Sequence, residues 1–314
     1  MPFPSDGVLV KTAKDLVAQL QALFGKHPGF RATHAKGSEL LSGTFTPSAE
    51  AKKLSSAPHF NEATTPVWVR FSNSTGIPNI PDNDSNADPR GIAIRFILGP
   101  HKHTDIVAHS TPFFPTHTGA QFLEMLQAIA ASPPDAEHPS AIEKFLGANP
   151  AALAFVTAPK PPPASYATEQ YWGVNAYKLI AADGTTTFIR YHVVPDAGIS
   201  TLDAAAAKEH DAEYLQKELS ARLQTGAIGF KILAQIAGDG DVTDDATVHW
   251  PASREVVELG SFKLEGRVPD NAKEVKQVIF DPIPRVRGVE PSDDPLLEMR
   301  AAIYLISGKQ RRAA

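Results

Sequence analysis

A series of short strand-like runs constrains the fold of this chain more than any other feature. Each run is rich in β-branched and aromatic residues, and loops containing Asp, Asn, Gly or Pro separate the runs. Because short turns of this kind join antiparallel strands, the pattern predicts an antiparallel sheet or barrel. The runs are Thr65–Asn73, Arg90–Leu98, Thr104–Ser110, Phe230–Ala237 and a pair within Asn175–Val194 that turns at Asp183–Gly184.

Helical patterns frame these strands. Apolar residues recur at helical spacing in Lys11–Phe24, Phe122–Ser132 and Leu202–Leu223. The run Ser292–Arg312 begins with two aspartates and Pro295, which suit the first turn of a helix. Helices outside an antiparallel sheet or barrel define an α+β fold rather than a doubly wound one.

The size of the chain allows one large domain or two ordinary ones. It has 314 residues, of which 42% are hydrophobic, enough to bury a large core. A proline-rich passage, Ala158–Gly173, could link two domains. Its aromatic residues favour instead an ordered connection that lies over a core.

The composition excludes several classes of function. The formal net charge is −5 and the pI about 6.1, so nothing indicates a nucleic-acid partner. No apolar run is long enough for membrane insertion. The segment Met1–Val10 lacks the pattern of a signal peptide, so we expect a cytoplasmic location in a bacterial cell. The absence of cysteine excludes disulfides, thiolate metal ligands and cysteine nucleophiles.

One tyrosine in the last helical run lies between two arginines. Arg300 precedes Tyr304 by four positions and Arg311 follows it by seven. A helical residue turns by about 100°, so all three side chains point to nearly one face. Two interpretations stay open. Tyr304 anchors the helix in a core beside a solvated basic tail, or the guanidinium groups favour its phenolate form, which a tyrosine ligand of ferric haem requires.

A histidine near the other end of the chain is a second candidate. His34 lies in the segment GFRATHAKG at residues 29–37, and a lone histidine is more often structural than catalytic. It becomes informative in combination, because the strand VRFS with Ser72, the segment DPRG at Asp88–Gly91 and the arginine–tyrosine pair follow it in the chain.

In this order and with these local sequences, the chain resembles the haem catalase family, and within it the small catalase-related peroxidases, or minimal catalases. RATHAKG is similar to the family segment around the distal histidine, and VRFS to the strand that follows. Four further matches come in the family's order: ADPRGIAIRF, TDIVAHSTPFF, FIRYHVVPDAG and RGVEPSDDPLLEMRAAIY. The last of them ends in the family's proximal tyrosine. Together the matches cover most of the chain.

The resemblance implies a single catalase-like haem-binding domain over residues 1–314. It would have an N-terminal helix within 1–25, an antiparallel β-barrel with inserted helices at 30–265, and a helix with the haem ligand at 292–312. The C-terminal helical region of ordinary catalases and the flavodoxin-like region of the largest ones would be lacking. The resemblance also favours a homo-oligomer, with a dimer expected.

The matched positions imply how a haem would be held. Tyr304 would be the axial ligand of the haem iron, and Arg300 would keep it as a phenolate. The cofactor would be haem b, which needs no cysteine for attachment. The other positions that match haem contacts of the family are Arg31, Arg70, Phe114, Phe122 and Arg311.

The resemblance also implies a catalytic set, two of whose members depart from the family. His34 would move a proton between the two oxygens of peroxide, and Ser72 would orient it. His109 stands where the family has an asparagine; it could donate a hydrogen bond to peroxide or pair with a buried partner. Thr33 replaces the usual valine, and its hydroxyl would face the distal pocket or bond the local backbone.

The expected function is therefore that of a peroxidase. Hydrogen peroxide or an organic hydroperoxide would oxidise a small organic electron donor, with weak or no catalase activity. Two alternatives stay open. One is a fatty-acid hydroperoxide isomerase, because the catalase-like allene oxide synthases also have threonine at the position of Thr33. The other is a haem-binding or sensing protein without catalysis, in which His109 occupies the iron.

Overall fold

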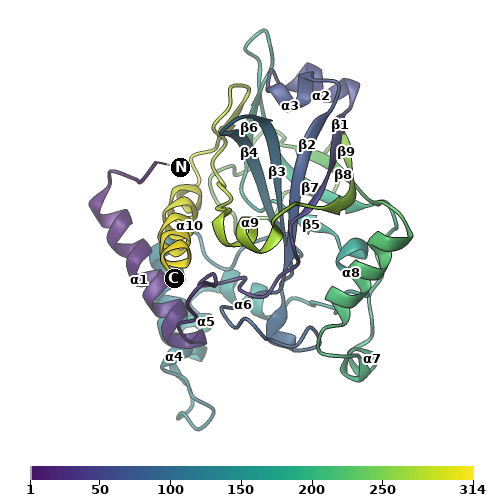
Figure 1. Ribbon diagram of the computed structural model, residues 1–314. Coiled ribbons are helices and arrows are strands. Elements are labelled where there is room, and N and C mark those ends of the chain that lie inside the picture. The colour runs from purple at the N-terminus through teal and green to yellow at the C-terminus, as the bar shows by residue number, and fades with distance from the viewer. Residues whose placement is uncertain (1) are drawn as a thin grey trace.

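Eight antiparallel strands close into a barrel at the centre of the molecule (Figure 1). The computed structural model describes residues 2–314, with strands β1 (Leu41–Pro47), β2 (Thr65–Ser72), β3 (Gly91–Gly99), β4 (Lys102–His109), β5 (Tyr171–Trp172), β6 (Tyr177–Ile180), β7 (Thr186–Pro195), β8 (Ile228–Ile236), β9 (Val256–Arg267) and β10 (Val289–Pro291). The barrel runs in the order β7–β5–β4–β3–β2–β1–β9–β8, and pairing of β8 with β7 closes it. Strands β6 and β10 extend the sheet beyond β7.

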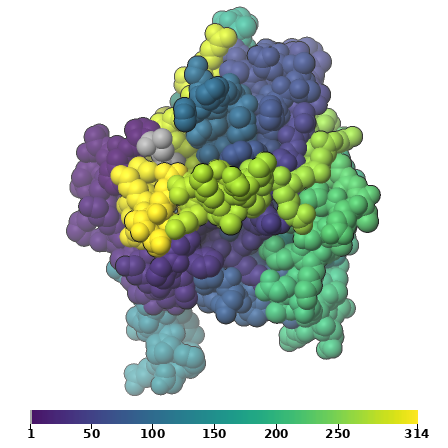
Figure 2. Space-filling model, viewed as in Figure 1, coloured from purple at the N-terminus to yellow at the C-terminus, as the bar shows by residue number. Residues whose placement is uncertain are grey.

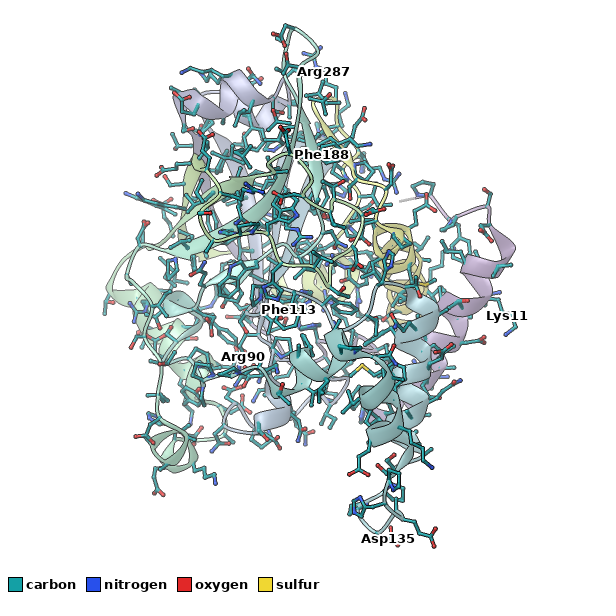
Figure 3. The ribbon with its side chains drawn as sticks, turned by 180° about the vertical axis from the view of Figure 1, so that it is seen from behind. Lys11, Arg90, Phe113, Asp135, Phe188 and Arg287 are labelled. Atoms are coloured by element: carbon teal, nitrogen blue, oxygen red, sulfur yellow. The ribbon has the colours of Figure 1, made fainter. Side chains whose placement is uncertain are left out.

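Helices surround the barrel, so the predicted α+β architecture is confirmed. They are α1 (Gly7–Phe24), α2 (Ala49–Leu54), α3 (Pro58–Asn61), α4 (Gly119–Ala130), α5 (Ala141–Ala148), α6 (Pro150–Thr157), α7 (Ala204–Glu209), α8 (Tyr214–Thr225), α9 (Asn271–Gln277) and α10 (Pro295–Ala313). Helices α1 and α10 pack together on one flank, α8 lies on the opposite flank, and α9 crosses between them (Figure 1). Figure 3, a view from behind, shows Asp135 at the tip of the loop that projects between α4 and α5.

Strand β2 shows how residue alternation gives the barrel two different faces. Val67, Val69 and Phe71 are fully buried inside the barrel, where they join its aromatic core. The alternate residues Arg70 and Ser72 point outward. Because α10 and the loop before β1 cover this outer face, the polar side chains of β2 are also buried, outside the barrel. This outer face supplies one wall of the candidate site.

The predicted long helix Leu202–Leu223 is wrong. The structure has two helices there, α7 and α8, separated by a turn. Two carboxylates stabilise this turn: Asp211 accepts a hydrogen bond of 2.8 Å from the backbone N–H of Glu213, and Asp82 accepts one of 2.9 Å from that of Leu215. Side-chain acceptors that bond the backbone in this way compete with continuous helix, and the second acceptor comes from a distant segment.

The structure gives the bounds of the N-terminal helix, the barrel and the C-terminal helix. Helix α1 lies within residues 1–25, the barrel strands run from residue 41 to residue 267, and α10 covers 295–313. The proline-rich passage before Gly173 is an ordered connection, since Tyr166 within it is fully buried and donates a hydrogen bond to Asn73. Within residues 2–314, no helix is both long and apolar enough to span a bilayer.

Candidate active site

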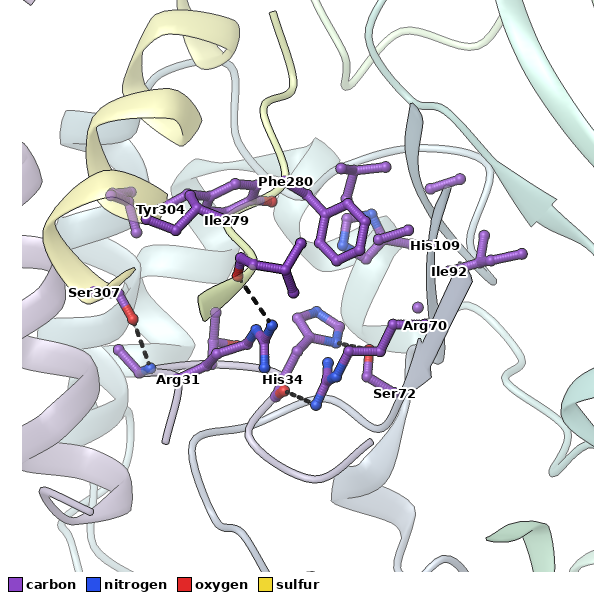
Figure 4. A pocket seen from close by; sticks show the side chains of 18 of the residues that line it. Arg31, His34, Arg70, Ser72, Ile92, His109, Ile279, Phe280, Tyr304 and Ser307 are labelled. Carbon is purple, nitrogen blue, oxygen red and sulfur yellow. Dashed lines mark hydrogen bonds between the residues drawn. The ribbon is translucent and has the colours of Figure 1, made fainter. Parts of the chain in front are cut away.

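A cavity lies between the outer face of strands β2, β3 and β4 and helix α10 (Figure 4). Its walls come from four separate parts of the chain: the loop at residues 31–34, the three strands, the segment 278–280 and α10. The structure brings together here eight of the residues that the sequence indicates: Arg31, Thr33, His34, Arg70, Ser72, His109, Tyr304 and Arg311. Figure 4 shows Tyr304 on one side of this space and His34 on the other.

Helix α10 presents Tyr304 to the cavity. The helix begins where its sequence predicts, because the side chain of Asp294 accepts a hydrogen bond from the N–H of Leu296 and Pro295 occupies the first turn. Arg300 does not line the cavity but lies buried behind the tyrosine, and its Nε donates to the Tyr304 hydroxyl at 3.2 Å. The spacing of four residues thus gives the expected contact.

A buried polar chain fixes Arg300 in this position. Its guanidinium donates to the amide oxygen of Asn175, whose Nδ2 donates to Asp294 at 2.8 Å. Burial lowers the pKa of Arg300, but Tyr304, Tyr177 and Asp294 outweigh burial and raise it above its ordinary value. A permanent positive charge therefore lies beside the phenolic oxygen. No pattern in the sequence indicated Asn175, which comes from a different part of the chain.

His34 faces Tyr304 from the other side. Its backbone has a left-handed φ of 53°, and its carbonyl accepts a hydrogen bond of 3.2 Å from Arg70. Its Nδ1 lies 3.0 Å from the Ser72 Oγ, which fixes the plane of the ring. Burial, and then the positive charge of Arg70, lower the pKa of His34 to about 4. The imidazole is therefore neutral at pH 7 and able to accept a proton.

The strand register leaves room for this imidazole. Gly91 on β3 pairs with Ser72 on β2 and with His109 on β4, so it lies between two polar side chains of the cavity wall. A Cβ at Gly91 would lie 2.9 Å from the Ser72 Oγ and 3.1 Å from the Nδ1 of His34. Only glycine lets the ring approach the strand so closely. We predicted no site role for Gly91, although DPRG was one of the informative segments.

The two residues that depart from the family pattern both line the cavity. The rings of His109 and His34 have centroids 5.3 Å apart. Burial, and then the neighbouring His34 and Arg300, keep the pKa of His109 well below its ordinary value. Within residues 2–314, neither the His109 ring nor the Thr33 hydroxyl has a hydrogen-bond partner, so a buried partner for His109 and a local backbone bond for Thr33 are both absent there.

Three arginines form the cationic end of the cavity. Arg31, Arg70 and Arg311 donate hydrogen bonds to backbone carbonyls, and none has a carboxylate partner among residues 2–314. Burial first, and then like charges nearby, lower the pKa of each, which is about 10 for Arg70 and for Arg311. The Nε of Arg70 is buried and has no hydrogen-bond partner within residues 2–314. Such a cluster fits a flat group with two carboxylates, as haem has, because the anion would relieve the repulsion.

Two predicted haem contacts lie outside the cavity wall. Phe114 and Phe122 pack on each other with ring centroids 5.2 Å apart, and Phe122 also joins the cluster between α1 and α10 that includes Tyr304. Their role in cofactor binding stays a prediction. The segment Val278–Phe280, by contrast, lines the cavity directly and was not predicted. It has no regular pattern in the sequence, and only the tertiary structure places it there.

The barrel, with a histidine and an arginine-bound tyrosine across one buried cavity, is the arrangement expected of a haem-dependent oxidoreductase. The sequence model of the Catalase family matches residues 7–314. The chain therefore belongs to the catalase family. As a member it is a haem-dependent oxidoreductase that acts on peroxide.

Individual relatives agree with this assignment. The chain is 37% identical to a catalase-related peroxidase of Mycolicibacterium paratuberculosis over 96% of this chain and 95% of the relative. It is 31% identical to a catalase-related peroxidase of Synechococcus elongatus over 98% of this chain and 90% of the relative. Among solved structures, a fungal catalase matches with a TM-score of 0.80 at 23% identity, covering 95% of this chain. This chain spans 63% of that catalase.

Proposed function

We propose that this protein is a peroxidase that uses hydrogen peroxide or an organic hydroperoxide to oxidise small organic donors, with weak or no catalase activity. One observation carries the proposal: a neutral imidazole, His34, and an arginine-bound phenol, Tyr304, face each other across a cavity. This cavity ends in three arginines that have no carboxylate partner in the described part of the chain, residues 2–314. The names of the two relatives that match nearly the whole chain support peroxidase activity.

The chain's own residues would hold haem b at both its iron and its edge. Tyr304 would ligate the iron, and Arg300 would stabilise the phenolate through the contact that it already makes. Arg31, Arg70 and Arg311 would bind the two carboxylates of the haem. The bound haem would supply the redox chemistry that amino-acid side chains lack.

His34 would transfer a proton between the two oxygens of the peroxide. With its Nδ1 donating to the Ser72 Oγ, its Nε2 has a free lone pair that accepts a proton from one peroxide oxygen and returns it to the other. Over the whole reaction two donor molecules each lose one electron and one proton. The peroxide takes up two electrons and two protons and leaves as two waters. His109, with its ring free toward the cavity, would hydrogen-bond the substrate where the family uses an asparagine.

The decisive experiment compares optical spectra of the haem-loaded protein and its Tyr304→Phe variant, before and after one equivalent of hydrogen peroxide. We expect a high-spin ferric tyrosinate spectrum that changes on peroxide addition, and loss of the tyrosinate bands in the variant. Tyr191→Phe is the matched control, since it deletes a hydroxyl from a buried tyrosine of the barrel core. An unchanged spectrum in Tyr304→Phe would contradict the ligand assignment.

Product analysis separates the competing functions. A peroxidase oxidises a phenolic dye, whereas rapid oxygen release without dye oxidation would indicate a catalase. An epoxide formed from a fatty-acid hydroperoxide would indicate an isomerase, the alternative that Thr33 in the cavity wall suggests. A six-coordinate low-spin spectrum that ignores peroxide would indicate that His109 occupies the iron and that the protein senses or stores haem.

A further inference from the structure

A second cavity opens on the far side of the three arginines. This groove has a volume of about 640 Å³ and lies between the loop at residues 29–41, helix α8 and helix α9. Figure 2 looks onto the face of the molecule where α8 and α9 are exposed. Arg31, Arg70 and Arg311 line both the groove and the cavity proposed to hold haem. These three residues therefore lie between the two spaces.

The groove has an excess of positive charge beside these three residues. Lys36 is neutralised by Asp82 at 2.9 Å and by Glu213 at 2.8 Å, and Arg267 pairs with Glu39. Lys276 on α9 also lines the groove and, like the three arginines, forms no ion pair within residues 2–314. Because two carboxylates face the single charge of Lys36, they offset one of these four charges, and the two carboxylates of a bound haem would balance two more. The remaining charge favours an anionic ligand in the groove.

The rest of the groove offers apolar surface. Phe30, next to Arg31 in the chain, is 48% exposed although its ring is large and apolar. Leu219 and Leu223 of α8 and Val275 of α9 also line the groove. An exposed aromatic ring beside cations matches a ligand that combines a carboxylate with an aromatic ring.

We propose that this groove binds the electron donor and that the donor is a phenolic carboxylic acid. The inference rests on the proposed peroxidase function and specifies its donor. A phenolic acid in the groove would place its carboxylate at Lys276 and the arginines and its ring near Phe30. Only the arginine side chains would then separate it from the haem cavity, so the phenol would pass its electron to the peroxide-oxidised haem and release its proton to solvent, which in turn supplies the protons for the two waters, without entering the space occupied by peroxide.

Calorimetry on the haem-loaded protein without peroxide tests the site directly. The probe is 4-hydroxyphenylacetate, and 4-ethylphenol is its uncharged counterpart. Lys276→Glu reverses a charge inside the groove, whereas Lys273→Glu makes the same change on the exposed side of the same helix. We expect Lys276→Glu to raise the Kd of the acid roughly 3- to 10-fold, with little change for 4-ethylphenol or for Lys273→Glu.

Turnover measurements separate failure of this inference from failure of the proposed function. We expect the KM for 4-hydroxyphenylacetate to rise in Lys276→Glu by the same factor as the Kd, with kcat and the oxidation of 4-ethylphenol unchanged. If both phenols are oxidised and the KM of each is the same in the wild type as in Lys276→Glu, the groove is not the donor site although the protein is a peroxidase. If the acid binds but neither phenol is oxidised, the donor role and the proposed function both fail.

Discussion

The most specific prediction concerns the single methyl group that Gly91→Ala would add. In the structure this Cβ would lie 2.9 Å from the Ser72 Oγ and 3.1 Å from both Cε1 and Nδ1 of His34. Ordinary contact begins at 3.4 Å, so the new atom is about 0.5 Å too close to the hydroxyl and 0.3 Å too close to the ring. The backbone of Gly91 has no left-handed φ, so alanine would add no backbone strain there and would act only through this steric contact.

The effect of Gly91→Ala on stability and on reaction rate depends on which group the new methyl displaces. Overpacking of this kind costs about 1–3 kcal/mol of stability, which the barrel tolerates. The His34 ring is the group that gives way, because it stands on a loop whereas Ser72 is fixed in a strand. Displacement of a proton-transfer group by a fraction of an ångström to 1 Å costs roughly 10- to 100-fold in rate. Tyr304 lies across the cavity and keeps its contact with Arg300.

We therefore expect Gly91→Ala to bind haem with an unchanged resting spectrum but to react with hydrogen peroxide roughly 10- to 100-fold more slowly in stopped-flow measurements. Gly266→Ala is the matched control, because Gly266 also lies in a barrel strand but its added Cβ would meet only the Ser42 Oγ, at 3.4 Å. A Gly91→Ala protein that reacts within twofold of the wild type would refute the role assigned to His34.

Two further predictions concern pH. A protonated His34 cannot accept a proton, so we expect the rate with peroxide to be constant above about pH 5 and to decline at lower pH with a midpoint of about 4. Stopped-flow measurements test this. A midpoint near 6.5 would contradict the burial of this ring. His59, enclosed by aromatic rings inside the barrel, has a pKa that burial lowers to about 3. Because the unfolded state takes up a proton near pH 6.5 and the folded state does not, this residue costs about 1.4 kcal/mol of stability per pH unit as the pH falls between those values. We expect the free energy of unfolding of His59→Leu in urea, relative to that of the wild type, to increase by about 2 kcal/mol when the pH is lowered from 6.5 to 5. If the two proteins lose stability in parallel over this range, the account is refuted.

Local patterns in the sequence were sufficient for much of the barrel. The alternation in β2, β3 and β4 predicted those strands to within two residues, because each has one face in the barrel core. The offset of four between Arg300 and Tyr304 predicted their contact, because helix geometry alone decides it. The grouping of His34 with Ser72 came from the family resemblance, and the structure joins them by a hydrogen bond.

Features that depend on distant segments could not be read from local patterns. The break between α7 and α8 requires Asp82, which lies far away in the chain, to bond the backbone of Leu215. Asn175 lies behind Tyr304 only because it bonds Arg300. Phe114 does not line the cavity but packs against Val174, Ala246 and Leu296, which come from distant parts of the chain. In each case the deciding partner is remote in sequence.

The two sides of the cavity are also joined by a direct bond between remote segments. The backbone N–H of Ala32 donates to the Ser307 Oγ at 3.0 Å, across a sequence separation of 275 residues. During synthesis the ribosome therefore releases the loop with His34 and the whole barrel before the helix with Tyr304. A nascent chain that stalls late in the barrel has His34, Arg31 and Arg70 but lacks Tyr304 and Arg311. Because both parts of the chain line the cavity, docking of α10 is the step that closes it.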